Sequence, residues 1–375
     1  MNDLVLKGGR VVDPSQGIDK VADVAFAGGK VSAIGDNLAG AESRNVAGKI
    51  VVPGLIDLHT HVYWGGTSLG VAAELLARSG GVTTFIDAGS AGAGNFAGFR
   101  MHVIERSPVR ILPYLNVSFP GIFAFSKSVM VGESADMRLI DPRECARVAR
   151  ENKDLVLGIK VRVGKSASGD SGAQPMYMAL EVAEEVDLPI MAHLDNPPPS
   201  RREVVEKLRR GDILTHCFRP FPNAPVRADG RIYEEVLAAR ERGVIFDIGH
   251  GGGSFGFGTT RAMLAAGFLP DVISSDVHAI SIEGPAFDLL TTMSKFLCLG
   301  VELPKVIAMA TLNPARAIDR PELGTLAAES CGDATVLELR DGKFDYTDCI
   351  GEQIVGSKKL VSAGVVIGGS WWHPA

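Results

Sequence analysis

The chain has 375 residues, of which 46% are hydrophobic and 22% charged, and its formal net charge is −6 at pH 7. Nucleic acids and anionic membranes bind concentrated Lys and Arg, so this acidic balance argues against both as main partners. No run of about 18 apolar residues occurs, so we expect no membrane-spanning helix. The five cysteines lack a CxxC pair, and the N-terminus lacks a signal-peptide pattern, so we expect a cytoplasmic protein with reduced thiols.

Both ends of the chain read as short strands separated by turns. Residues 3–36 contain two glycine pairs, Gly8-Gly9 and Gly28-Gly29, which predict hairpin turns. Residues 334–369 have the same texture. We therefore predict a small β-sandwich domain built from both termini, residues 1–50 plus 330–375.

The middle of the chain, residues 51–329, alternates apolar runs with amphipathic segments. The predicted helices include 68–80, 175–186, 200–211 and 231–243, and the predicted strands are 50–59, 81–89, 109–118, 155–163, 188–194, 212–218, 243–250 and 271–278. Eight strands joined by crossover helices predict an α/β fold, a closed (β/α)₈ TIM-like barrel. A doubly wound open sheet is the structural alternative.

Several of the predicted strands end in polar groups, although buried parallel strands should be almost entirely apolar. These groups are His59, His61, Lys160, His193, His216 and Asp276. In a barrel the C-terminal ends of the strands form the active site, so the six side chains should meet at one mouth. His59 and His61 share one face of their strand, because side chains two apart point the same way. Imidazole and carboxylate groups suit Zn²⁺ and similar cations, with zinc the default.

Each of these residues also has a purely structural interpretation. A single strand-end histidine is more often hydrogen-bonded than a metal ligand, and an aspartate there often caps a helix. Four of the eight histidines, however, fall at the ends of three strands. Lys160, if desolvated, would lose basicity and could capture CO₂ as a carbamate that bridges two metals. It could equally extend outward to solvent or form a Schiff base.

The ordered set of PGLIDLHTH, a strand-four lysine, two later strand-end histidines and a strand-eight aspartate resembles the amidohydrolase superfamily. The resemblance is to the binuclear branch with a carboxylated lysine, in dihydroorotase-like and deacetylase-like metallohydrolases. It implies one metal at His59, His61 and Asp276 and a second at His193 and His216. The Lys160 carbamate and a hydroxide would bridge the two metals.

The same resemblance implies hydrolysis of an amide or ester bond of a small acyl substrate. The bridging hydroxide would attack the carbonyl, and Asp276 would carry its proton to the leaving group. A dihydroorotase usually has an arginine soon after the HxH pair, whereas this chain has Val62-Tyr63-Trp64. The expected function is therefore a deacylase, for N-acyl amino acids or O-acyl hydroxy acids.

Residues that could contact the substrate lie near the same strand ends. Arg162 has the parity of Lys160 and could hold a carboxylate, or it could form an ion pair at the rim. Lys165 is a second candidate for that carboxylate. Tyr63 and Trp64 could line the pocket or simply pack. His250, in a glycine-rich loop, and His278 are further candidates.

Two other function classes stay open from the residues alone. One is a cyclic amide hydrolase or a mononuclear deaminase, although deaminases usually lack the strand-four lysine. The other is a barrel that lost its chemistry and serves as a scaffold, which the complete set of six polar residues argues against. Barrels of this kind often form homo-oligomers, but no pattern in the chain sets a number of subunits.

Overall fold

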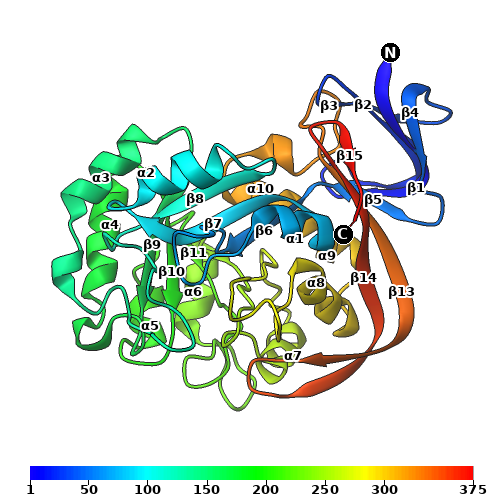
Figure 1. Cartoon of the computed structure of the whole chain (residues 1–375). Helices are drawn as coiled ribbons and strands as arrows, with labels where there is room; N and C mark the ends of the chain where they lie inside the picture. The colour runs from blue at the N-terminus through cyan, green and yellow to red at the C-terminus, as the bar shows by residue number, and fades with distance from the viewer. Residues whose placement is uncertain (375) are drawn as a thin grey trace.

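Two sheets organise the chain in the computed structural model, which describes residues 1–374. The larger part is a parallel sheet whose strands follow one another in chain order and curl around a common axis (Figure 1). Its strands are β6 (Leu55–Thr60), β7 (Val82–Gly92), β8 (Arg110–Asn116), β9 (Gly158–Val163), β10 (Ile190–Leu194), β11 (Ile213–Leu214) and β12 (Ile245–Phe246).

An eighth extended segment, residues 272–277, closes this sheet into a barrel. On one side, Asp247 and Val272 form a parallel bridge, and on the other side Thr60 and Val277 form a second one. The backbone N–H of His61 donates to the carbonyl of Val277 at 3.0 Å. The predicted (β/α)₈ barrel is thus confirmed, and the open-sheet alternative is excluded, since an open sheet would leave these two edges apart.

Helices cover the outside of the barrel, as the amphipathic segments predict. Local signals set their ends: Asp141 caps α3 by accepting from two backbone N–H groups, and Gly243 ends α6 with a φ of 88°. The helices are α1 (Ala73–Gly80), α2 (Phe96–Phe99), α3 (Pro142–Glu151), α4 (Gln174–Val186), α5 (Arg201–Val205), α6 (Glu234–Arg242), α7 (Phe257–Ala265), α8 (Leu289–Cys298), α9 (Leu303–Ala308) and α10 (Leu312–Ala317). Short 3₁₀ or π turns occur at 100–104, 137–139, 169–171 and 321–323.

The first predicted strand, residues 50–59, is in fact two strands in different sheets. Ile50–Pro53 forms β5 in the terminal sheet, and Leu55–Thr60 forms β6 in the barrel. Gly54 lies between them, where a Cβ atom would clash with the hydroxyl oxygen of Thr83. The chain therefore passes from one sheet to the other at a point too crowded for any side chain.

The second sheet combines the two termini. Its order is β15-β14-β13-β5-β1-β2-β3, with β4 pairing beside β1. Gly28-Gly29 forms the predicted turn, but the prediction for Gly8-Gly9 is wrong, because β1 runs through this pair with a bulge. The remaining bounds are β1 (Asn2–Asp13), β2 (Ile18–Ala27), β3 (Lys30–Gly35), β4 (Gly40–Asn45), β13 (Ala334–Thr347), β14 (Gln353–Ile367) and β15 (Ser370–Trp372).

The hairpin of β13 and β14 extends from this sheet along the barrel to the loop after β12 (Figure 1). Asp348 at its tip accepts a hydrogen bond from the backbone N–H of Phe257 at 2.9 Å. The N–H of Cys349 donates to the carbonyl of Phe255 at 3.0 Å. The C-terminal hairpin thereby supports the loop that follows the seventh barrel strand.

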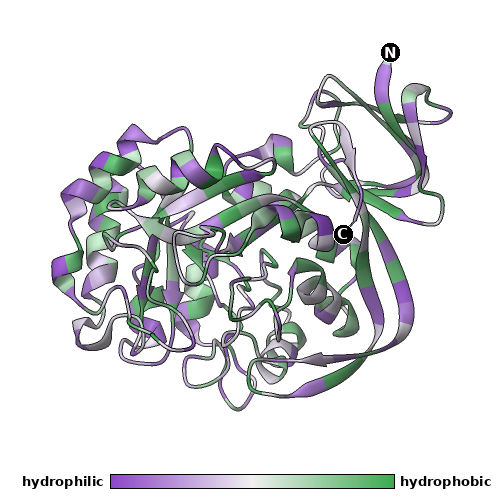
Figure 2. Cartoon of the chain, viewed as in Figure 1, coloured by the Kyte–Doolittle hydropathy of each residue, from purple (hydrophilic) through white to green (hydrophobic). Residues whose placement is uncertain are grey.

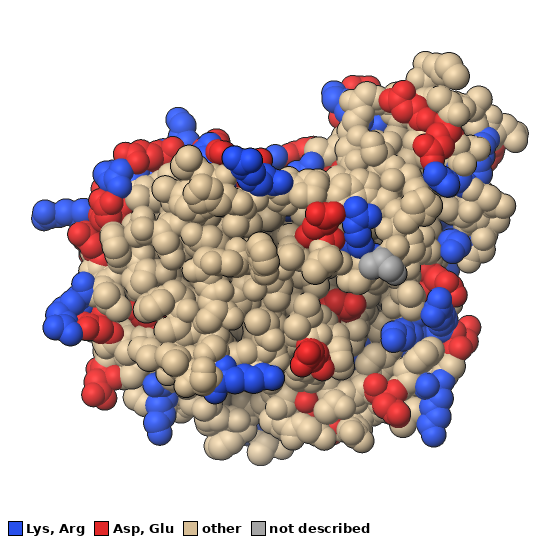
Figure 3. Space-filling model, viewed as in Figure 1, with Lys and Arg blue, Asp and Glu red and all other residues tan. Residues whose placement is uncertain are grey.

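The distribution of polar side chains follows this architecture. In Figure 2 the outer helices carry both hydrophilic and hydrophobic residues, as expected for helices that pack one face on a barrel. On the face seen in Figure 3, positive and negative side chains are interspersed around the rim and the middle is largely uncharged. Among residues 1–374 no helix has the length and apolar character that crossing a membrane requires.

Candidate active site

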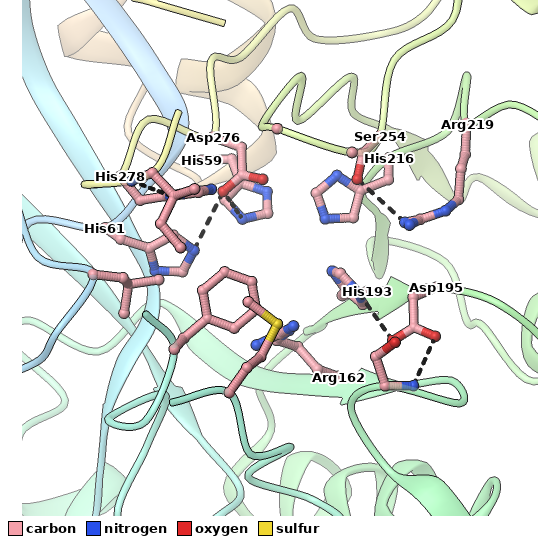
Figure 4. Close-up of a pocket in the computed structure, with 17 residues that line it drawn as sticks. His59, His61, Arg162, His193, Asp195, His216, Arg219, Ser254, Asp276 and His278 are labelled. Carbon is pink, nitrogen blue, oxygen red and sulfur yellow. Dashed lines mark hydrogen bonds and ion pairs between the residues drawn. The ribbon is translucent and has the colours of Figure 1, made fainter. Parts of the chain in front are cut away.

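Three electron-pair donors converge at the open end of the barrel. The Nε2 atoms of His59 and His61 lie 3.4 and 3.3 Å from Oδ1 of Asp276. All three side chains are buried, and their ligand atoms lie within 4.8 Å of one another. The position of His59 on β6, of His61 directly after it, and the closure of the barrel by residues 272–277 bring them together (Figure 4).

A hydroxyl group and a carboxylate orient the ring of His59. Its Nδ1 lies 2.7 Å from Oγ1 of Thr215, which donates its own proton to Asp247 at 2.7 Å. Burial raises the pKa of Asp247 to about 6, so Asp247 is still a carboxylate at neutral pH. Because the threonine proton is engaged, Thr215 can only accept from His59. The proton of His59 therefore sits on Nδ1, and its Nε2 lone pair faces Asp276.

The ring of His61 is held in the same way by a different pair. Its Nδ1 lies 2.9 Å from Oγ of Ser90, and Ser90 donates to Asp87 at 2.8 Å. Asp87 is fully buried and also accepts the backbone N–H of Val62. His61 therefore also presents an Nε2 lone pair to Asp276. Three lone pairs facing one point without a proton between them repel one another unless a cation lies there.

His193 and His216 lie beside this group. Their ring centroids are 4.5 Å apart, and His216 lies 5.1 Å from the ring of His59. Nδ1 of His216 donates to the carbonyl of Gly249 at 2.6 Å, which leaves its Nε2 unprotonated. Nε2 of His193 is buried and has no hydrogen-bond partner among the described residues. Burial lowers the pKa of both imidazoles well below its usual range, so both are neutral.

Lys160 lies on β9, close enough for its charge to act on His59 and His216, and is completely buried. Its Nζ atom has no hydrogen-bond partner within residues 1–374. Burial lowers the pKa of this amine to about 7, so a substantial fraction is neutral at physiological pH. An unpaired buried amine is costly, which indicates that Lys160 is completed by a group other than the protein.

The backbone is strained at two of these positions. His216 has a φ of 62° and Asp276 a φ of 48°, values that few residues other than glycine adopt. Such conformations persist only where the surrounding structure imposes them, and they occur often at active sites. Here they turn both side chains inward from the ends of their strands.

The cluster opens into a cavity of about 290 Å³, the size of a small ligand (Figure 4). Arg162 and His278 line this cavity together with the four histidines and Asp276. One part of the wall is apolar, formed by Leu69, Phe125, Met130 and Ile280. The cavity therefore joins a polar, cation-suited end to a hydrophobic wall.

Four of the predicted substrate contacts do not line the cavity. The ring of Tyr63 stacks on Phe99 with centroids 4.5 Å apart, and its hydroxyl donates to the carbonyl of Asn95 at 3.2 Å. His250 is fully buried, with Nε2 2.6 Å from Nζ of Lys295. The loop that His250 begins reaches the cavity instead through Gly252, Gly253 and Ser254. Trp64 is mostly exposed, and Lys165 does not line the cavity.

Sequence reasoning missed two charged residues that line the cavity, Asp195 and Arg219. Asp195 follows His193 by two positions, so the parity that linked His59 with His61 could have found it. Arg219 follows a strand end, where no periodic signal applies. Also missed were the hydroxyl and carboxylate partners of His59 and His61, which come from other strands.

Comparison with known proteins supports one family assignment. The sequence profile of the Amidohydrolase family matches residues 50–247. A deacetylase of Agrobacterium fabrum is 35% identical over 334 residues, covering 88% of this chain and 81% of the relative. The crystal structure of a dihydroorotase has a TM-score of 0.90 at 34% identity, covering 100% of this chain and 99% of that chain. That of an adenine deaminase has a TM-score of 0.91 at 29% identity, with 100% of both chains covered. From its profile match and its full-length relatives, the chain belongs to the amidohydrolase family of hydrolytic enzymes.

Proposed function

We propose that the converging donors hold two divalent cations, with zinc as the default metal. The ligands would be His59, His61, Lys160, His193, His216 and Asp276. The observation that carries this proposal is the set of unprotonated donors at His59, His61 and Asp276, whose mutual repulsion a bound cation would offset. The unpartnered Nε2 of His193 and Nζ of Lys160 fit a second cation beside the first.

Lys160 would take part as a carbamate. Its neutral amine can bond to the carbon of CO₂ with release of one proton, which leaves an anionic group with two oxygens. That group would lie where the Nζ atom now lacks a partner, and it would offset the positive charge of the cations.

The chemistry of the site follows from its donors. Two divalent cations, when bound, acidify a water molecule and polarise a carbonyl group. Asp276 lies beside His59 and His61 and can accept the proton of that water, then pass it to the leaving group. The hydrophobic wall of Leu69, Phe125 and Met130 would exclude bulk water from the reacting carbonyl.

The reaction that this site supports best is hydrolysis of an amide or ester bond of a small acyl substrate, as in a deacetylase. N-acyl amino acids and O-acyl hydroxy acids are the substrate classes we favour. The relative named deacetylase, which is 35% identical over 88% of this chain, adds support. The test is a screen of N-acetyl and O-acetyl acids on protein loaded with zinc and bicarbonate. Release of acetate supports the proposal, and its absence across the screen would reject it.

A cyclic amide hydrolase is the second candidate, favoured by the crystal structure titled dihydroorotase. The segment after the HxH pair argues against it, because Val62, Tyr63 and Trp64 supply no cation for a substrate carboxylate. Ring opening of dihydroorotate or a hydantoin at a higher kcat/KM than acetate release would favour this candidate. Metal content distinguishes this proposal from a mononuclear deaminase. We expect about two cations per chain, whereas such a deaminase would hold one.

We also propose that residues 1–50 and 330–375 form one small domain and that residues 51–329 form the catalytic barrel. The pairing of β5 (Ile50–Pro53) with both β1 and β13 supports a terminal unit made from both ends of the chain, and it extends that unit to Pro53. Limited proteolysis that releases the two termini still paired would support this division.

The hydroxyl relay to His59 can be tested by replacing Thr215 with valine, which has the same shape but no hydroxyl. Without the acceptor at Nδ1, His59 no longer keeps its Nε2 lone pair toward the cation. We expect zinc to bind about 10- to 100-fold more weakly, as measured by competition with a chelator. Thr215→Ser should restore the affinity. An unchanged affinity in Thr215→Val would show that the relay does not orient His59.

Cation affinity should fall at acidic pH. Burial raises the pKa of Asp276 to about 6 in the metal-free protein, so below that pH a cation must displace its proton. Burial lowers the pKa of His61 to about 3, so above pH 5 this ring carries no second proton that a cation would have to displace. We expect zinc affinity to drop about tenfold per pH unit below pH 6, measured by chelator competition. A flat profile from pH 7 to pH 5 would contradict this account of Asp276.

A further inference from the structure

We infer that Arg219 binds the carboxylate of the substrate, and that the substrate is a small acyl carboxylic acid with an apolar side chain. This inference rests on the proposed deacylase function and adds to it the residue that binds the carboxylate of the substrate. Arg219 lies three residues after His216, and its N–H donates to the carbonyl of His216 at 3.1 Å. The strained turn at His216 therefore aims both side chains into the cavity.

The hydrogen bonds of Arg219 leave a free edge. Its Nη1 donates to the carbonyl of Leu194 at 3.0 Å and to Oγ of Ser254 at 3.2 Å. Among residues 1–374, its Nε and Nη2 donate no hydrogen bond, and no carboxylate lies within the 4.0 Å that an ion pair requires. These two atoms form one side of the planar fork, the geometry that binds a carboxylate with two parallel hydrogen bonds.

The side chain of Arg219 is half-buried, and this burial lowers the pKa of its guanidinium. Asp195 attracts this cation only from a distance, so a ligand carboxylate would supply the direct ion pair that the described residues do not. Asp195 lines the same cavity but does not fill this role. Its carboxylate accepts the backbone N–H groups of Ser166 and Ala167 instead.

Arg162, the arginine that the sequence favours for a carboxylate, is already neutralised. Its Nη1 pairs with the buried carboxylate of Glu133 at 3.2 Å, and its guanidinium lies over the ring of Phe125, 4.9 Å from the centroid. A substrate carboxylate would have to compete with Glu133 for Arg162, whereas Arg219 is free. The structure therefore favours Arg219 over Arg162.

The position of Arg219 also defines how the substrate lies. Figure 4 shows Arg219 and Ser254 beyond His216, on the side of the cavity opposite His61 and His278. A carboxylate at Arg219 places the acyl carbonyl of a short acid over the histidines and Asp276. The α substituent then faces the wall of Leu69, Phe125, Met130 and Ile280, which favours apolar side chains.

The experiment compares acids with their uncharged carboxamides on zinc-loaded enzyme. The substrates are N-acetylphenylalanine and O-acetyl phenyllactate, both enantiomers, with the matching amides. We expect Arg219→Met to raise KM for the acids at least 100-fold and to change kcat/KM for the amides less than threefold. Arg219→Lys should recover part of the loss, because it keeps the charge but not the fork.

Two further variants make the comparison specific. Arg202→Met removes an exposed arginine that pairs with Glu206 on α5, and it should leave both substrate series unchanged. Arg162→Met should change kcat/KM for acids and amides by the same factor, because Arg162 packs on Phe125 and does not bind the carboxylate. An equal loss for acids and amides in Arg219→Met, or a larger acid-specific loss in Arg162→Met, would overturn the inference.

A binding measurement separates this inference from the proposed function. Calorimetry with phenyllactate and its amide on zinc-loaded wild type and Arg219→Met reports carboxylate recognition without turnover. Binding of the acid that is lost in Arg219→Met supports the role of Arg219, even if no acetyl compound is hydrolysed and the deacylase function falls. Hydrolysis of the acids with equal acid binding in both proteins would overturn the role of Arg219 alone.

Discussion

Replacing Lys160 with alanine should lower the metal content from about two cations per chain and reduce kcat/KM by at least about 1000-fold. The reason is that Lys160 is fully buried, its Nζ has no hydrogen-bond partner among residues 1–374, and alanine cannot form the proposed carbamate. The measurement is elemental analysis of wild type and Lys160→Ala, both supplied with zinc and bicarbonate, followed by the acetate-release assay.

A second buried lysine provides a matched control for this experiment. Lys295 is equally buried, but its Nζ donates to His250 and to the carbonyls of Pro285 and Thr347, all within 2.8 Å. Lys295→Met should lower the melting temperature and keep the metal content of the wild type. Unchanged metal content in Lys160→Ala would mean that Lys160 is structural and that the bridged two-metal centre is wrong.

Replacing Asp276 with asparagine should reduce kcat by about 100- to 10,000-fold, because an amide cannot accept the proton that a carboxylate accepts. Asparagine is close in size and tolerates the left-handed backbone at this position, where φ is 48°. The fold should therefore persist, and thermal melting will verify this. Steady-state kinetics on zinc-saturated protein provide the measurement.

The control for Asp276→Asn uses an aspartate with the same backbone. Asp187 ends α4 with a φ of 54° and lies away from the cavity. Asp187→Asn should leave kcat and KM unchanged. If kcat of Asp276→Asn stayed within about threefold of wild type, Asp276 would not carry the proton, and its part would be limited to holding a cation.

Much of the barrel could be predicted because its strands are local patterns. Seven of the eight predicted runs contain strands of the parallel sheet, and the eighth run contains the segment that closes the barrel. The strand-end histidines follow from the same patterns, since a period of two and a common barrel mouth place them together. The break at Gly54 could not be predicted, because the crowding by Thr83 arises only when two sheets meet.

The cavity shows where local patterns stop being informative. Tyr63 and His250 are near the strand ends in sequence, yet Phe99 and Lys295 hold them elsewhere. Arg162 was the natural choice for a substrate carboxylate until Glu133, 29 residues away, proved to neutralise it. The pairing of such charges depends on loops whose paths carry no periodic signal.

The sequence by itself determined the barrel, its family and the residues that gather at its mouth, because strand parity and the order of strands are encoded locally. Only the tertiary structure decided the protonation of His59 and His61, through Thr215, which follows β11, and Ser90 on β7. It also decided which arginine keeps its charge free for a substrate. These properties depend on contacts between residues distant in sequence, whose partners and distances exist only once the chain is folded.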